Sequence, residues 1–126
     1  MRIFLGLILF VSVALGEHIA WRSDFDKVLT KAKKEKKDIL LLILKKDCKR
    51  CKSIFVEVFN EKEVQERVNE KYLPVIAYFE DKNSYPVELF YTGQFPSLFF
   101  VSYKDESFLN APLLGIITKE ELLDSL

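Results

Sequence analysis

Cysteine and histidine are scarce in this sequence of 126 residues, which holds two cysteines and one histidine. A closed structural zinc site usually takes four such ligands, so a metal centre would need a site shared between two chains. The chain also lacks a surplus of basic over acidic residues, because its formal net charge is zero. A dedicated nucleic-acid-binding protein needs such a surplus to neutralise phosphates. We therefore expect neither a metal nor a nucleic acid as partner.

The apolar run near the start, Ile3 to Leu15, is shorter than the roughly 20 residues that span a bilayer. A positively charged start precedes it, and Ala14-Leu15-Gly16 resembles a cleavage site before Glu17. These features predict a signal peptide at residues 1–16 and an exported domain at 17–126, with an uncleaved membrane anchor as the alternative. The short charged start is typical of bacteria and indicates the periplasm, where disulfides persist.

The chain shows no repeats and no low-complexity linker, which favours one α/β domain. Hydrophobic periodicity and turn residues predict its elements. In chain order, these are a helix capped by Ser23 and running to Lys37, a strand at Ile39 to Leu44, a helix starting at the cysteines, a helix capped by Asn60, a strand at Leu73 to Phe79, a short helix at Glu88 to Tyr91, a strand at Ser97 to Tyr103, a turn at Lys104 to Ser107, a strand at Phe108 to Leu114, and a helix opened by a capping box at Thr118. The apolar run of the first strand fits a sheet core, although a buried helix has the same pattern.

Charge is unevenly distributed along the chain. The segment from Arg22 to Lys52 holds 12 basic and 5 acidic residues, whereas Ser53 to Leu126 holds 6 basic and 13 acidic residues. Such a segment is either a solvated helix face or an electropositive surface that attracts acidic partners.

The stretch K-K-D-C-K-R-C-K, Lys45 to Lys52, contains both cysteines. A purely structural disulfide would gain little from closing so short a loop. A redox role has a stronger physical basis, because Cys48 is placed at the start of a helix, where unpaired N–H groups stabilise a thiolate. Cys51 lies one turn further along, where it can attack a mixed disulfide. We favour the redox interpretation and keep the structural disulfide as the alternative.

Three stretches together resemble the thioredoxin superfamily, and in particular its small exported members. They are Trp21 to Lys52 with its C-K-R-C motif, Phe95-Pro96-Ser97 leading into an apolar strand, and Gly115 to Leu122. The resemblance implies an α/β, thioredoxin-like fold with a central mixed β-sheet flanked by helices on both faces. It also implies that Pro96 is a cis-proline lying against the cysteines and that the backbone of Phe95 pairs with an extended substrate.

The sequence departs from the family pattern beside the cysteines. Asp47 replaces the tryptophan often found there, Leu42 stands at the position of a buried acid, and Lys49-Arg50 replaces Gly-Pro. Two cations and a helix end favour the thiolate, while Asp47 opposes it. We predict that the pKa of Cys48 is lowered.

The resemblance implies a periplasmic thiol-disulfide oxidoreductase with Cys48 as nucleophile and Cys51 as resolving thiol. No cofactor is expected beyond the Cys48–Cys51 disulfide. The chain is too short for the helical insertion of periplasmic oxidases, which favours a reductase or isomerase. Expected partners are exported protein thiols or disulfides and an upstream redox donor, with the protein acting as a monomer. The alternative is a non-catalytic binding module, or chaperone, that carries a structural disulfide and a groove lined by four aromatic residues, Phe90, Tyr91, Phe95 and Phe99.

Overall fold

The computed structural model describes residues 18–126, so the predicted signal peptide lies outside the described residues. This part of the chain forms four helices and four strands. They are α2 (Phe25–Glu35), β1 (Asp38–Leu44), α3 (Lys49–Glu57), α4 (Lys62–Lys71), β2 (Tyr72–Tyr78), β3 (Ser97–Val101), β4 (Leu113–Leu114) and α5 (Lys119–Ser125). Within residues 18–126, the helices are all too short or too polar to cross a membrane.

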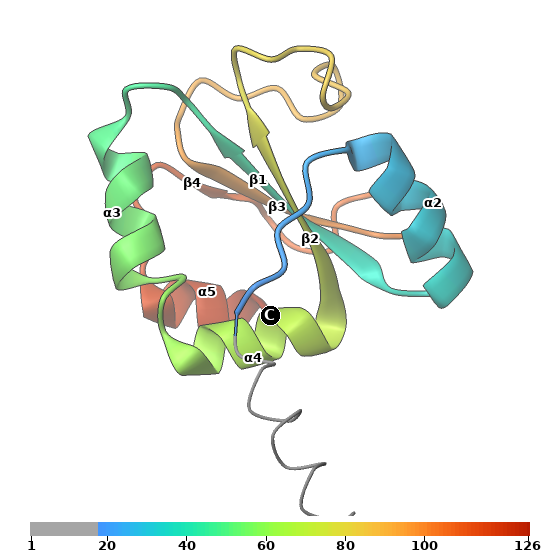
Figure 1. Ribbon diagram of the computed structural model, residues 1–126, viewed down its shortest axis with the longest axis horizontal. Helices are drawn as coiled ribbons and strands as arrows, with labels where there is room; N and C mark the ends of the chain where they lie inside the picture. The colour runs from blue at the N-terminus through green and yellow to red at the C-terminus, as the bar shows by residue number, and fades with distance from the viewer. Residues whose placement is uncertain (1–17) are drawn as a thin grey trace, which may run out of the picture.

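The four strands form one mixed sheet in the order β2-β1-β3-β4. β1 pairs in parallel with β2, and β3 is antiparallel to both β1 and β4. Figure 1 shows α2 on one side of this sheet and α3, α4 and α5 on the other. The predicted α/β fold, a mixed sheet with helices on both faces, is confirmed.

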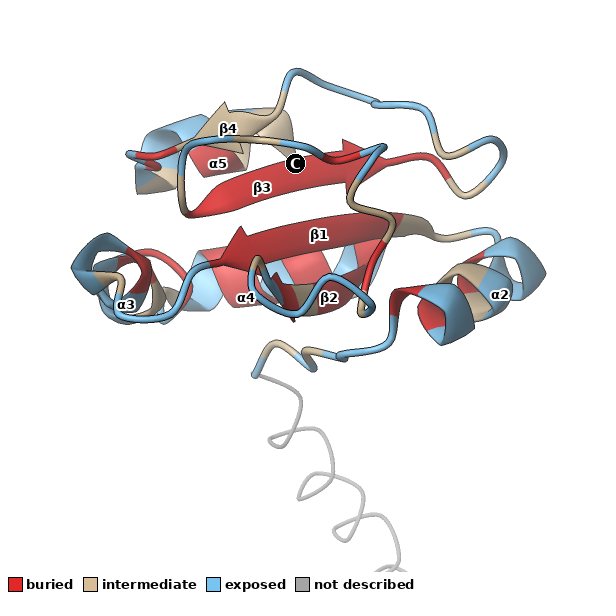
Figure 2. Cartoon of the chain, turned by 90° about the horizontal axis from the view of Figure 1, so that it is seen from above, coloured by how far each residue is buried: buried red, intermediate tan, exposed pale blue. Residues whose placement is uncertain are grey.

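β1 is central and buries its side chains on both faces. Leu40 and Leu42 pack in the cluster that includes α3, α4 and α5, whereas Ile39, Leu41 and Ile43 pack in the cluster that includes α2. This division follows the period of two along a strand. Figure 2 shows β1 and β3 as almost entirely buried, which fits their apolar runs at residues 39–44 and 98–101.

Two of the predicted helix caps are wrong by one residue. Asp24, rather than Ser23, caps α2, and its carboxylate accepts a hydrogen bond of 3.2 Å from the N–H of Lys27. Serine and aspartate are equally good caps, so the sequence could not choose between neighbours. Glu61, rather than Asn60, precedes α4, and its side chain makes no capping hydrogen bond. The capping box of Thr118 with Glu121 at the start of α5 is confirmed.

The segment between β2 and β3 forms turns, so the short helix predicted at Glu88 to Tyr91 is wrong. Phe90 is buried there and packs against Phe25 of α2, with ring centroids 5.5 Å apart. Burial of one aromatic side chain therefore anchors the segment without a helix.

The last two strands are shorter than predicted. β3 ends at Val101, and the strand expected at Phe108 to Leu114 is reduced to Leu113–Leu114 and an isolated bridge between Val101 and Phe108. Pro112 lacks an N–H group and cannot donate to the ladder just before β4. The sheet therefore ends in a short edge strand.

Candidate active site

Both cysteines lie where β1 gives way to α3, as predicted. Cys48 is the N-cap of α3, and its Sγ accepts a hydrogen bond of 3.1 Å from the N–H of Cys51. The two residues form a disulfide, with their Cα atoms 5.2 Å apart. Cys48 is half-buried, whereas Cys51 is only 4% exposed.

This geometry gives the two sulfur atoms different chemistry. The Sγ of Cys48 occupies the place of a capping oxygen, where helix N–H groups point at it. A hydrogen bond to an ionised acceptor is about twice as strong as one to a neutral acceptor, so the thiolate of Cys48 is favoured after reduction. Cys48 is also the more accessible sulfur. It therefore suits attack on an external sulfur, and the buried Cys51 suits the intramolecular step.

Two features fix the conformation of the short segment between β1 and Cys48. Asp47 adopts a left-handed conformation with φ 55°, which aspartate tolerates better than most residues. The N–H of Lys46 lies 3.2 Å from each carboxylate oxygen of Glu80, beyond the end of β2. These contacts fix the direction in which the chain enters α3.

The three predicted tuning residues surround the disulfide at the surface. Asp47, Lys49 and Arg50 are all exposed, and the last two lie in the first turn of α3. A Cβ placed on Gly115 would lie 3.4 Å from Nη1 of Arg50, so this cation reaches the segment before α5. The effect of these charges on the pKa of Cys48 stays a prediction.

The Phe95–Pro96 peptide bond is cis, the isomer that the family resemblance implies. Pro96 is buried, and its carbonyl accepts a hydrogen bond of 2.8 Å from the N–H of Gly115. The hydroxyls of Thr92 and Ser97 both bond to the carbonyl of Gln94 and brace this loop. The part that Phe95 and Pro96 would play in binding substrate stays a prediction.

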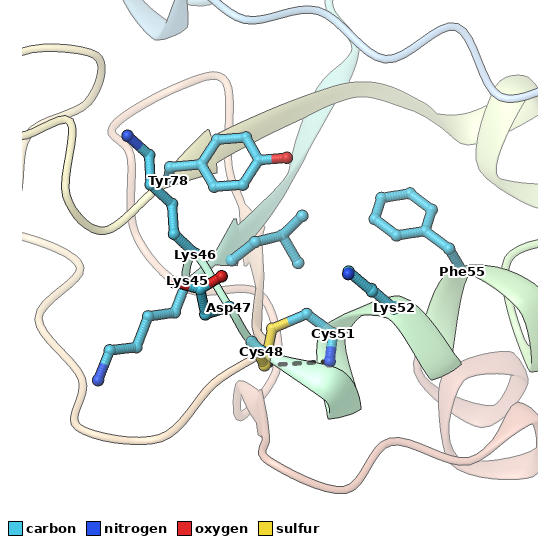
Figure 3. Close-up of a pocket in the computed structure, with 9 residues that line it drawn as sticks. Lys45, Lys46, Asp47, Cys48, Cys51, Lys52, Phe55 and Tyr78 are labelled. Carbon is cyan, nitrogen blue, oxygen red and sulfur yellow. Dashed lines mark hydrogen bonds between the residues drawn. A yellow bond between two sulfur atoms is a disulfide. The ribbon is translucent and has the colours of Figure 1, made fainter.

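A pocket of about 420 Å³ opens beside the disulfide. Its lining comes from the ends of β1 and β2, from the link that follows β1, and from α3: Leu44, Lys45, Lys46, Asp47, Cys48, Cys51, Lys52, Phe55 and Tyr78. We call it the disulfide pocket. Figure 3 shows Tyr78 and Phe55 on opposite sides of this hollow, with both cysteines at its base.

Phe55 and Tyr78 are site residues that the sequence alone did not predict. A usable signal existed, because β1 and β2 are parallel and the carboxyl ends of parallel strands meet at the same edge of a sheet. Tyr78, the last residue of β2, therefore lies beside the residues that follow β1. Phe55 lies one helical turn beyond Cys51 on α3, a spacing that places the two side chains on one face.

The aromatic groove of the alternative function is not assembled. Phe90 and Phe99 are core residues, 1% and 3% exposed, whereas Tyr91 is 75% exposed. Phe95 is half-buried, with its ring 5.0 Å from that of Phe79. Among residues 18–126, no three His, Cys, Asp or Glu side chains are grouped so that they could hold a metal ion.

Several solved structures share this arrangement of strands and helices. The C-terminal domain of DsbD from Neisseria meningitidis, in its oxidised form, is 21% identical, with a TM-score of 0.63 over 79% of this chain and 88% of that chain. A thioredoxin from Thermus thermophilus is 12% identical, with a TM-score of 0.72 over 87% and 84%. A protein described as DsbH oxidoreductase is 19% identical, with a TM-score of 0.67 over 79% and 74%. At these identities the likeness is one of fold.

A search of curated proteins with this sequence finds no match. A family model described as thioredoxin-like matches residues 20–102, a span that runs from the segment before α2 to the end of β3 and includes both cysteines and Pro96. The chain therefore belongs to the thioredoxin-like family.

Proposed function

We propose that this protein is a thiol-disulfide oxidoreductase of the periplasm that exchanges disulfides with exported proteins. The observation that carries the proposal is the asymmetry of the Cys48–Cys51 pair, with one sulfur accessible at a helix N-terminus and the other buried behind it. The thioredoxin-like neighbours support the same chemistry. Location in the periplasm rests on the predicted signal peptide at residues 1–16.

In the reductive direction, the thiolate of Cys48 attacks one sulfur of a substrate disulfide. A mixed disulfide forms, and the other substrate sulfur leaves as a thiolate that takes a proton from water. Cys51 then loses its proton and attacks the sulfur of Cys48, which releases the second substrate thiolate. Two electrons have passed to the substrate, and the protein holds the Cys48–Cys51 disulfide until a partner dithiol reduces it.

We assign the protein to reduction or isomerisation rather than oxidation. It acts as a monomer, with protein thiols or disulfides on one side and an upstream dithiol donor on the other. No cofactor is required beyond the disulfide itself. Residues 18–126 carry no helices beyond α2 to α5, and this lack of a helical insertion is the basis for the direction.

Insulin reduction driven by dithiothreitol tests the proposal. We expect the wild-type protein to accelerate precipitation of the insulin B chain, and the Cys48→Ser and Cys51→Ser variants to lose the effect. Cys51→Ser should also accumulate mixed disulfides with exported proteins in cells, because the resolving thiol is missing. Circular dichroism of both variants controls for folding. An inactive wild-type protein whose disulfide resists dithiothreitol would instead indicate the non-catalytic binding module.

A further inference from the structure

The disulfide pocket has a composition that selects a particular kind of substrate. Three lysines and one aspartate line it, which leaves a surplus of positive charge around both cysteines. Its apolar part is Leu44 with Phe55 and Tyr78. A pocket that combines two aromatic rings with cations fits a segment that carries both acidic and aromatic side chains.

The cations do not all face the pocket equally. The ammonium of Lys45 lies 5.9 Å from the ring centre of Phe95, on the side of the cis-proline loop. Lys46 leaves the strand end beside Tyr78, and Lys52 leaves α3 beside Phe55 (Figure 3). Lys52 is therefore the cation beside the space between the rings, whereas the side chain of Lys46 extends past Tyr78, away from Phe55, and lies at the outer edge of the pocket (Figure 3).

Two acidic groups oppose this charge. Asp47 lines the pocket, and Glu80 lies behind it, where its carboxylate accepts from the backbone N–H of Lys46. That contact engages the backbone, so it leaves the ammonium group of Lys46 available to a ligand. Lys46 and Lys52 are both exposed side chains.

The pocket is also separate from the loop that carries Pro96. Its lining comes from β1, β2 and α3, whereas Phe95 and Pro96 precede β3 on the opposite side of β1. The residues on one side of the substrate cysteine can therefore occupy the disulfide pocket. The residues on the other side of that cysteine can lie toward the cis-proline loop. A volume of about 420 Å³ is in the usual range for ligand sites and accommodates a few side chains.

We infer that the disulfide pocket binds acidic and aromatic residues next to the target cysteine, so that the protein preferentially reduces disulfides in acidic segments of its protein substrates. This inference rests on the proposed thiol-disulfide exchange. The exchange step is the one described above, with electrons passing from the dithiol to the substrate disulfide. The pocket adds only the affinity that brings the substrate sulfur to Cys48.

The test compares three short peptides that share one cysteine and one tyrosine and differ only at four flanking positions, which are acidic, neutral or basic. Each is supplied as its symmetric disulfide to the pre-reduced protein, and thiol release is followed by chromatography. Every rate is divided by the rate of the same peptide with dithiothreitol, which removes differences in intrinsic reactivity. At low salt we expect the normalised rate of the acidic peptide to exceed that of the basic peptide by about tenfold. The acidic peptide forms ion pairs with two exposed lysines, whereas the basic peptide is repelled by them.

Added salt should reduce this ratio, because the screening length falls to about 3 Å at 1 M ionic strength. Replacing tyrosine by serine in the acidic peptide should lower its rate about threefold, through loss of the contact with Phe55 and Tyr78. The pocket variant Lys46→Gln/Lys52→Gln should lose most of the preference for acidic peptides. The matched control, Lys27→Gln/Lys34→Gln, removes two exposed lysines from α2 and should keep the preference.

Equal normalised rates for the three peptides would overturn the inference and leave the proposed function standing. The same holds if the pocket variant discriminates as well as the wild-type protein does. Failure to reduce any of the three peptides would remove the proposed function, and this inference with it.

Discussion

Replacing Gly115 by alanine tests the junction between the cis-proline loop and the segment before α5. Gly115 has a φ of 75°, in the left-handed region, and its N–H donates to the carbonyl of Pro96 at 2.8 Å. An added Cβ would lie 3.1 Å from Oε1 of Gln94 and 3.4 Å from Nη1 of Arg50. Both neighbours are ends of flexible side chains and can move away. The backbone conformation therefore dominates the cost.

An L-residue in the left-handed region costs about 1–2 kcal/mol. Alanine also reduces the entropy of the unfolded chain, which offsets roughly 0.4–1 kcal/mol of that cost. Gly93→Ala is the matched control, because a Cβ there meets nothing within 4 Å and no left-handed φ is involved. The gain in the unfolded state is common to both variants and cancels in their difference. We expect Gly115→Ala to be less stable than Gly93→Ala by about 1–2 kcal/mol.

Urea unfolding of the oxidised proteins, followed by circular dichroism, measures this difference directly. Keeping the disulfide formed in both variants holds its contribution constant. Equal free energies of unfolding for the two variants would refute the reasoning, because the left-handed conformation would then carry no cost. A change in insulin reduction by Gly115→Ala alone would show that the junction also positions Pro96.

Two further predictions concern titration. In the reduced protein, thiolate absorbance as a function of pH should give Cys48 a pKa below that of a free cysteine, and Lys49→Gln/Arg50→Gln should raise this pKa; a wild-type pKa at or above the free value would contradict the prediction. Burial, and secondly the carboxylate of Asp38, raise the pKa of Tyr72, so the neutral phenol is favoured in the folded protein. The stabilisation that Tyr72 contributes to the folded protein is therefore fully present below the pKa of the unfolded chain, near pH 10. It is lost as pH rises through the raised pKa of the folded protein. Urea unfolding between pH 8 and 11 should show a smaller alkaline loss for Tyr72→Phe than for the wild-type protein, and parallel losses would contradict the assignment.

The parts of the fold that the sequence predicted well have local signals. The run at β1 is apolar throughout because the strand is covered on both faces. The start of α3 at the cysteines and the Thr118–Glu121 capping box are set by residues within one turn of each other. Period and capping are properties of neighbouring residues, so they can be read without knowledge of the tertiary fold.

The parts that failed depend on contacts between distant residues or on choices between equal neighbours. Phe90 is placed by its packing on Phe25, which no local pattern encodes. β4 is cut short at Pro112, although its apolar residues favour a longer strand. The disulfide pocket needs β1, β2 and α3 together, so Tyr78 could be linked to Cys48 only after the order of the strands was known.

The substitution of Leu42 for an acid changes how charge acts on the dithiol. Leu42 is fully buried and has no ionisable group, so its position contributes no charge to the site. Asp47, Lys49 and Arg50 are all exposed, and salt screens exposed charges far more than buried ones. The interaction of Cys48 with the helix N-terminus is a contact within the fold and is screened less. We therefore expect the helix end to set the baseline stability of the thiolate in the reduced protein, and the surface charges to adjust it in a way that weakens with ionic strength. In the proposed reaction, proton transfer at Cys51 has no buried acid at position 42 to assist it, and the disulfide pocket, which Cys51 lines, offers solvent a route to this sulfur.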